Sequence, residues 1–302
     1  MGESSLLADL VVDSRGRESH IVQWLTSMGY PAPKETLVNS YLGYATRIYQ
    51  KPTGEFDFTI LLIRGTPPAS KRGGVINPIE GDRWMVTLAG AAKDYPPTDE
   101  KGFLEFIRSL PAPNLYQAIK DAVPLTPISG YLKTENRWRH FEQMDQRPEG
   151  LVVLGDAVCA FNPVYGQGMT VAVSGALVLA HCLEKSGKNL SGLSKVVPHQ
   201  LSRMIQGPWL LATGDDYRYT ETSGAQRNAL TGLTHYYMDH VIYLASQDAR
   251  IFTLFFEVAH LIKPIRLLFE PWIMVKAIAS IAKFQFRAKR QIAKKTLPQE
   301  EI

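Results

Sequence analysis

One stretch of the sequence constrains the fold more than any other. Residues 151–154 form an apolar run of Leu and Val, Gly155-Asp156 follows it, and no Asp, Glu, Lys or Arg occurs from residue 157 to 183. Asn162-Pro163 and nearby glycines interrupt this uncharged stretch before it could cross a bilayer. The pattern predicts a buried strand, a turn and then a buried, closely packed helix over residues 170–183.

The turn carries residues suited to holding a ligand. A strand that ends in Gly-Asp places the Asp156 carboxylate at the carboxyl edge of a sheet, where open α/β sheets bind ligands. That carboxylate can accept hydrogen bonds from the hydroxyls of a sugar or a ribityl chain. Pro163 fixes the chain, and Gly166 and Gly168 allow backbone N–H groups to approach a ligand closely. The N-terminus of the following helix suits an anion or an electron-rich carbonyl.

The order Gly-Asp-Ala-x5-Pro-x-x-Gly-Gln-Gly, over residues 155–168, resembles the second flavin-binding motif of FAD-dependent monooxygenases of the aromatic hydroxylase type. Squalene epoxidases, geranylgeranyl reductases and flavin halogenases are related to that family. The resemblance implies that Asp156 contacts the ribityl chain of FAD and that Gln167 lies against the isoalloxazine. The implied cofactor-binding residues are Gly155, Asp156, Pro163, Gly166, Gln167, Gly168 and Met169. No catalytic side chain and no metal ligand is assigned.

The amino-terminal segment fits the same family. Residues 6–13 predict a buried strand, residues 14–19 a turn, and residues 21–28 a helix that ends at Gly29. In the family, an Asp-Gly turn after this strand lies near the pyrophosphate and the nicotinamide nucleotide. Here the turn reads Arg15-Gly16, a departure that weakens the assignment of NAD(P)H as the reductant.

The middle of the chain predicts a mostly antiparallel sheet with helices on one side. Strands are expected over 38–49, 56–63, 74–79, 83–89 and 125–132, and helices over 98–110 and 114–122. The charged and aromatic segment 135–140 is interpreted as a solvated strand or turn with a packed Trp138, although it could instead face substrate or flavin.

The predicted fold is therefore α/β with a mixed α+β character: a partial Rossmann-like FAD/NAD(P)-binding layer, an antiparallel-sheet substrate domain and a helical tail. The FAD-binding portion comprises residues 1–37 and 151–190, the substrate domain residues 38–150, and the helical region residues 191–302.

A Gly-x-Gly-x-x-Gly turn for the ADP half of FAD is missing from this plan. The nearest pattern begins at Gly166, and Val171 occupies its third glycine position. We therefore expect the ADP-binding unit to precede Met1 in a longer protein, to come from a partner chain, or to have been lost. Weak or no FAD binding by this chain alone follows from that expectation.

Composition excludes several other classes. Lys and Arg number 33 against 29 for Asp and Glu, a net charge of +4 that is too mild to indicate nucleic acid. Two cysteines, Cys159 and Cys182, exclude a disulfide scaffold, and Cys159 is expected to be buried and inert. The seven histidines show no metal-ligand spacing, and the first residues do not resemble a signal peptide. A cytoplasmic location is expected.

The carboxyl end is apolar and basic. Residues 251–262 predict an apolar helix, and five cations without an intervening acid follow later: Arg287, Lys289, Arg290, Lys294 and Lys295. Two interpretations remain open, a helix that packs over the substrate chamber or a peripheral membrane contact.

Taken with the resemblance, these features predict an FAD-dependent oxidoreductase of the monooxygenase type, a hydroxylase or epoxidase acting on an apolar or aromatic small molecule. Two alternatives remain open. The chain could be a non-catalytic remnant or partner-binding subunit that no longer binds the cofactor, or it could be a prenyl-lipid reductase.

Overall fold

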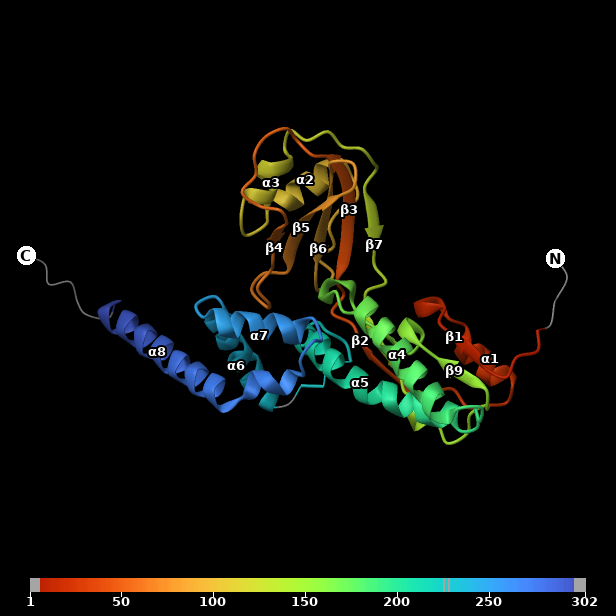
Figure 1. Ribbon diagram of the computed structural model, residues 1–302. Helices are drawn as coiled ribbons and strands as arrows, with labels where there is room; N and C mark the ends of the chain where they lie inside the picture. Colours follow the sequence, from red (N-terminus) through yellow and green to blue (C-terminus); the bar gives the residue numbers. More distant parts are fainter. Residues whose placement is uncertain (1–5, 225, 228, 296–302) are drawn as a thin grey trace, which may run out of the picture. The chain divides into compact units, whose positions relative to one another are not determined.

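The structure is a computed structural model that describes residues 6–224, 226–227 and 229–295, with the side chains of residues 229 and 284–295 left out of the description. The chain divides into two compact units, Met1–Gln226 and Arg227–Ile302, which are described separately (Figure 1). Helix α5, which belongs to the helical region predicted over residues 191–302, lies in the first unit.

The two predicted strands of the FAD-binding portion pair with each other. β1 (Val11–Asp13) and β9 (Leu151–Val153) form a parallel sheet in which Val11 lies opposite Leu151. Helix α1 (Ile21–Ser27) follows β1 and ends as predicted at Gly29, whose φ of +85° lets the Tyr30 N–H reach back to the carbonyl of Leu25.

The prediction of a buried strand over residues 6–13 is wrong. The strand begins only at Val11, and Leu6 and Leu7 are fully exposed. Val11 and Val12 remain 48% and 39% exposed, because β9 is the one strand that pairs with β1 in the described part of the chain.

A five-stranded antiparallel sheet dominates the first unit, as predicted. Its order is β4 (Leu61–Ile63), β5 (Arg72–Ile79), β6 (Arg83–Gly90), β3 (Gly43–Gln50) and β7 (Ser129–Tyr131). Helices α2 (Glu100–Arg108) and α3 (Asn114–Ile119) cover one face (Figure 1). Alternate residues of β6, such as Val86 and Leu88, pack there against Phe103 of α2 and Leu115 of α3.

Three predicted strands are shorter or divided. The strand expected over residues 38–49 splits into β2 (Glu35–Val38) and β3, which lie in different sheets. A turn separates them, in which Asn39 accepts a hydrogen bond from the N–H of Tyr41. Of residues 56–63 only β4 is a strand, because Phe56 and Phe58 turn their rings onto Trp84. The strand expected over residues 125–132 is reduced to β7.

A third sheet includes part of the flavin-motif segment. Its order is β10 (Cys159–Ala160), β8 (Asn136–Arg139) and β2, with both pairings antiparallel. The expected solvated strand or turn over residues 135–140 is therefore corrected to a central strand. Its Asn136 is fully buried, and Arg139 is 5% exposed because Glu35 and the carbonyl of Ala157 bind its guanidinium.

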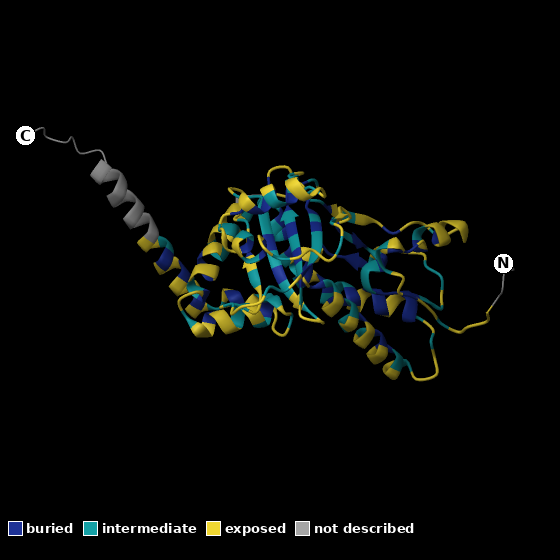
Figure 2. Cartoon of the chain, turned by 90° about the horizontal axis from the view of Figure 1, so that it is seen from above, coloured by how far each residue is buried: buried dark blue, intermediate teal, exposed yellow. Residues whose placement is uncertain are grey.

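Helix α4 (Gly168–Ser186) packs on α5 (Leu193–Asp216). The prediction of a buried helix holds for one face only, which carries Val171, Gly175, Leu179 and Cys182. The opposite face is open, since Val173 and Leu177 are 64% and 67% exposed, and exposed residues alternate with buried ones along the helix (Figure 2).

The second unit is helical, with α6 (Ala229–Ala245), α7 (Ala249–Ala259) and α8 (Pro271–Lys295) around a small core that includes Val241, Ile251 and Ile273. No helix in the described ranges combines the length and the apolar character that crossing a membrane requires. The five predicted basic residues lie on α8, and their side chains fall outside the described part.

Candidate functional site

The turn after β1 is organised by a buried carboxylate. Asp13 accepts hydrogen bonds from the N–H of Arg15 at 3.1 Å and its Nε at 3.0 Å, and another from the hydroxyl of Ser19. Burial alone would raise the pKa of Asp13, but the hydrogen bonds from Arg15 and Ser19 outweigh it and hold the pKa below its ordinary value. The carboxylate therefore stays ionised and fixes the turn.

Arg17 joins this turn to the flavin-motif segment. It lies in η1 (Gly16–Glu18) and donates to the carbonyls of Glu135 at 2.8 Å and Phe161 at 3.0 Å. Its guanidinium also pairs with the Glu135 carboxylate at 3.1 Å. A Cβ added to Gly16 would lie 3.9 Å from the Cβ of Asp156. The two segments predicted to serve the cofactor therefore lie side by side.

Gly155 and Asp156 lie at the start of η3 (Gly155–Ala157), directly after β9. Gly155 has a φ of +61° and lies against the first turns of α4, since a Cβ there would be 3.6 Å from that of Ala172. The Asp156 side chain is half-buried, and this burial raises its pKa, opposed by the charge of Arg17. Asp156 carries the free carboxylate at this edge of the sheet.

The remaining predicted residues belong to a segment that we call the cofactor loop, residues 162–168, and to the start of α4. Pro163 begins η4 (Pro163–Tyr165), and Gly166 ends it in the left-handed conformation with a φ of +66°. Gln167 is the buried N-cap residue of α4, Gly168 is the first residue of that helix, and Met169 is 83% exposed.

The structure brings the two ends of the motif together. A Cβ on Gly168 would lie 3.8 Å from Oδ1 of Asp156, and one on Gly166 would meet no atom within 4 Å. The side chain of Gln167 makes no capping hydrogen bond to α4. A carboxylate acceptor, an open glycine cradle and the N-terminus of a helix thus adjoin one another.

This donor and acceptor set fits a flavin. A ribityl chain offers hydroxyl donors that a carboxylate can accept, and the pyrimidine edge of an isoalloxazine offers carbonyl acceptors that suit backbone N–H groups at a helix N-terminus. The glycines leave room for a planar ring to approach the backbone. In the described part of the chain, no group of three or more His, Cys, Asp and Glu could hold a metal ion.

A buried polar network beneath the cofactor loop escaped the sequence analysis. The hydroxyl of Tyr44 donates to Oδ1 of Asn162 at 2.7 Å, and the N–H of Asn162 donates to Oδ1 of Asn136 at 2.8 Å. Nδ2 of Asn136 then donates to Asp216 at 2.6 Å, as does the hydroxyl of Tyr165 at 2.5 Å. No motif or spacing in the sequence links these residues, which come from β3, β8, the loop and the end of α5.

Cys159 lies next to this network and is buried, as predicted. Burial raises the pKa of its thiol well above the ordinary value, with a further contribution from the charge of Asp156. The thiol is therefore not a nucleophile in the folded chain.

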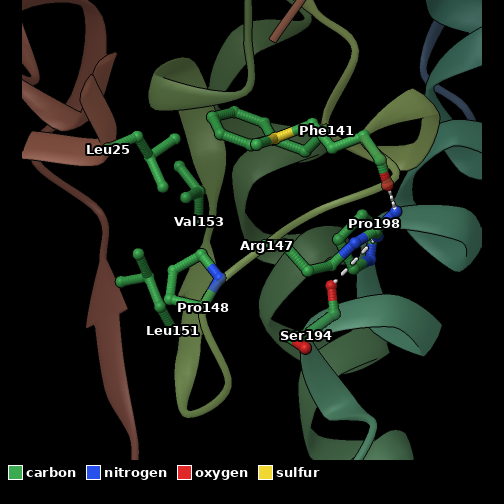
Figure 3. A pocket seen from close by; sticks show the side chains of 9 residues that line it. Leu25, Phe141, Arg147, Pro148, Leu151, Val153, Ser194 and Pro198 are labelled. Atoms are coloured by element: carbon green, nitrogen blue, oxygen red, sulfur yellow. Dashed lines mark hydrogen bonds between the residues drawn. The ribbon is translucent and has the colours of Figure 1, made fainter. Parts of the chain in front are cut away.

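A small cavity lies elsewhere in the first unit. Leu25, Phe141, Leu151, Val153 and Pro198 are among its lining residues (Figure 3). Its volume of about 20 Å³ is roughly that of one water molecule. Arg147 at its side is engaged by the carbonyls of Met144 and Ser194. The cavity is too small to hold a substrate.

Comparison with known proteins agrees with this geometry. The sequence profile of the squalene epoxidase family matches residues 75–204. Protein Rv3254 of Mycobacterium tuberculosis is 28% identical over 215 residues, which cover 70% of this chain and 45% of that protein. The flavin-dependent brominase Bmp2 superposes with a TM-score of 0.55 at 13% identity, over 93% of this chain and 64% of the brominase. A variant of Klebsiella pneumoniae HpxO complexed with FAD gives 0.51 at 16% identity, over 72% and 55%.

The profile match over residues 75–204 bears out the predicted relationship with the family that includes the squalene epoxidases, and the superpositions confirm the mixed α/β fold. The chain spans about half the length of the curated relative that it matches, 45%. The roles of the seven predicted cofactor residues stay predictions.

Proposed function

We propose that this relative of the FAD-dependent monooxygenases provides the flavin-facing and substrate-facing part of an enzyme that oxygenates an apolar or aromatic small molecule. The observation that supports it most directly is the convergence of Asp156 with the glycines at the N-terminus of α4, where a Gly168 Cβ would lie 3.8 Å from the carboxylate.

Each residue of the site has a binding task in this proposal. Asp156 accepts hydrogen bonds from the ribityl hydroxyls, and the first-turn N–H groups of α4 face the pyrimidine edge of the ring. Gly166 and Gly168 let the backbone come close to the ring plane. FAD, when bound and reduced, supplies the electrons and the reaction with O₂, and the protein orients the substrate and excludes water. NAD(P)H is the proposed source of the electrons.

The open face of the five-stranded sheet supports an apolar or aromatic substrate. Opposite the face that packs on α2 and α3, the strands present half-buried side chains that include Val75, Met85 and Ile48. Thr46 and Thr87 pair across neighbouring strands, with their hydroxyls 2.9 Å apart. This wall mixes apolar side chains with hydroxyls and with the amide of Asn77, which favours an aromatic or oxygen-bearing substrate over a purely hydrocarbon prenyl chain.

Binding of FAD to the purified full chain tests the proposal. We expect weak, saturable quenching of flavin fluorescence, because the ADP-binding turn is missing from the described residues. Asp156→Ala should weaken that binding by about tenfold or more, the value of one or two hydrogen bonds to a charged acceptor. Asp121→Ala is a matched control, since the Asp121 side chain is 85% exposed.

Three outcomes are informative. Equal binding by the wild type and Asp156→Ala would refute the assignment of Asp156. Absence of any saturable binding favours the alternative of a remnant or a partner-binding subunit. Retention of FAD at full occupancy after purification would contradict our expectation that this chain alone binds FAD weakly.

We also propose a peripheral contact between the second unit and an anionic membrane surface. Helix α8 buries Ile273 and Ala277 on one face and exposes Trp272, Val275 and Ile278 on others, at 39%, 67% and 58%. Exposed aromatic and aliphatic side chains on a helix rich in Lys and Arg suit a lipid interface.

Flotation with phosphatidylcholine vesicles, with and without phosphatidylglycerol, tests this contact. We expect the full chain to float with the anionic vesicles, and the double variant Val275→Asp, Ile278→Asp to stay in solution. Leu62→Asp on β4, where Leu62 is 66% exposed, should float like the wild type. Failure of the wild type to float would refute the contact.

A further inference from the structure

The buried network beneath the cofactor loop ends on an acid that the proposed function does not use. Asp216, the last residue of α5, is 1% exposed. Its carboxyl group accepts from Tyr165 at 2.5 Å and from Asn136 at 2.6 Å. No Lys, Arg or His among the described residues forms an ion pair with it. A buried carboxyl group without a cation is costly to ionise, so its place in the fold needs an explanation.

Two of the donors to Asp216, Tyr165 and Asn136, lead directly to the cofactor loop. Tyr165 is the residue before Gly166, and burial raises the pKa of its hydroxyl well above the ordinary value, so that the hydroxyl keeps its proton. Asn136 carries the second connection, because its Oδ1 accepts the N–H of Asn162, the first residue of the loop. Asp216 thus holds the middle of the loop directly through Tyr165 and its first residue through Asn136.

The network also reaches the proposed substrate wall. Tyr44 of β3 donates to Oδ1 of Asn162 at 2.7 Å, and the same oxygen accepts the N–H of Val164 at 3.2 Å. A displacement of the loop would therefore move the Tyr44 side chain on β3, the strand of the proposed substrate wall. A displacement of Tyr44 would likewise move the loop.

We propose that Asp216 is a positioning residue that fixes the cofactor loop through its hydrogen bonds with Tyr165 and Asn136. The inference rests on the proposed function, because the loop affects catalysis only if it holds FAD. It extends that function by naming a group that is remote from the reacting atoms and that keeps the cofactor loop in one conformation.

The order of the loop should depend on pH. The pKa of Asp216 is raised to about 7, because burial and the charge of Asp215 raise it by more than the hydrogen bonds from Tyr165, Ser40 and Asn136 lower it. The pKa of the buried group lies above the ordinary value of 3.8, so burial favours the protonated form. The stabilisation is present at acidic pH and is lost as the pH rises through about 7, where opening of the loop would hydrate the carboxylate.

The ionisable groups around Asp216 do not counter this trend. Arg64 and Arg218 both pair with the Asp215 carboxylate, at 2.5 and 3.1 Å. The other ionisable groups that interact with Asp216 are hydroxyls whose pKa values burial raises: Tyr44, Tyr165 and Tyr219.

Hydrogen–deuterium exchange of the full chain without added flavin tests the inference. Protection factors, corrected for intrinsic exchange, are measured for peptides covering residues 162–168 between about pH 5 and pH 8. In the wild type we expect protection to fall at least about tenfold over this range. Asp216→Asn is neutral at every pH, and its amide can accept from Asn136 and donate to the hydroxyl oxygen of Tyr165, so its protection should not change with pH. Asp216→Ala should lose protection at every pH.

Asp215→Asn is the matched control, because it makes the same chemical change one residue away. It should keep the pH-dependent fall but move its midpoint to lower pH, since the Asp215 charge raises the pKa of Asp216. Protection that is flat with pH in the wild type, or that titrates equally in Asp216→Asn, would overturn the inference. The flavin titration of Asp156→Ala is separate, so the proposed function can fail while this result stands.

Discussion

The turn that joins β1 to α1 offers the sharpest test of how the amino-terminal segment is held. Asp13→Asn keeps the shape of the side chain but removes its charge and places an amide where Arg15 and Ser19 need an acceptor. Ser19 in turn accepts the N–H of Ile21 at 3.1 Å, so the carboxylate also supports the start of α1. The perturbation therefore acts on one strand end and one helix start.

The size of the effect follows from the exposure of each partner. The Arg15 side chain is 42% exposed and can be rehydrated, so loss of its bonds should cost about 1 kcal/mol or less. Ser19 is 8% exposed, and an unsatisfied buried hydroxyl costs about 1–2 kcal/mol. We expect a total of about 1–3 kcal/mol, which corresponds to a melting temperature about 2–12 °C lower for a unit of this size.

Urea unfolding at neutral and acidic pH measures this prediction. Because the pKa of Asp13 is lowered in the folded chain, its stabilisation is present above the ordinary value of 3.8 and is lost as the pH falls through the folded-state pKa. The difference between wild type and variant should therefore shrink below about pH 4. Asp99→Asn is the control, since Asn caps a helix as well as Asp does. A loss below about 0.5 kcal/mol at neutral pH, or one that persists unchanged in acid, would refute the reasoning.

Three further outcomes are expected. Phe103→Ala should lower the free energy of unfolding in denaturant by about 3–5 kcal/mol, because Phe103 is fully buried. Leu177→Ala, on the open face of α4, should lower it by less than about 0.5 kcal/mol. Tyr44→Phe should destabilise the first unit by about 1 kcal/mol, since Asn162 keeps one of its two donors. A thiol reagent should leave Cys159 unmodified until urea unfolds the chain, and rapid labelling of the native protein would contradict its burial.

The sequence pattern correctly predicted the strands and helices whose determining residues lie within one short segment. The hairpin of β5 and β6 follows from alternation on both sides of the Gly81 turn, and α2 follows from the Asp99 cap, which accepts the N–H of Gly102 at 2.8 Å. The adjacency of Asp156 and Gly168 could be expected because a motif covers both residues. In each case the residues that decide the structure are close in sequence.

Features that depend on partners far along the chain could not be predicted. The segment 135–140 has the composition of a surface strand, yet β2 and β10 pair with it on both sides and bury its Asn136. Asp216 lies 80 residues from Asn136 and 51 from Tyr165, and nothing near it in the sequence indicates a buried acid. Burial of a polar group is decided by tertiary packing, which single-segment periodicity does not report.

The two arginines in the first turn bear on how a nucleotide would approach it. An Arg-Gly-Arg sequence beside a cofactor site suggests a phosphate clamp, since guanidinium groups bind phosphate in a bidentate manner. Here Arg15 forms an ion pair with Asp13 and lies 3.7 Å above the ring of Trp24. Arg17 pairs with the carboxylate of Glu135 and donates hydrogen bonds to the carbonyls of Glu135 and Phe161. A phosphate would have to replace these bonds. Arg15 therefore holds the turn between β1 and α1, Arg17 joins that turn to the flavin-motif segment, and the negative charge of a dinucleotide has to be met by other groups.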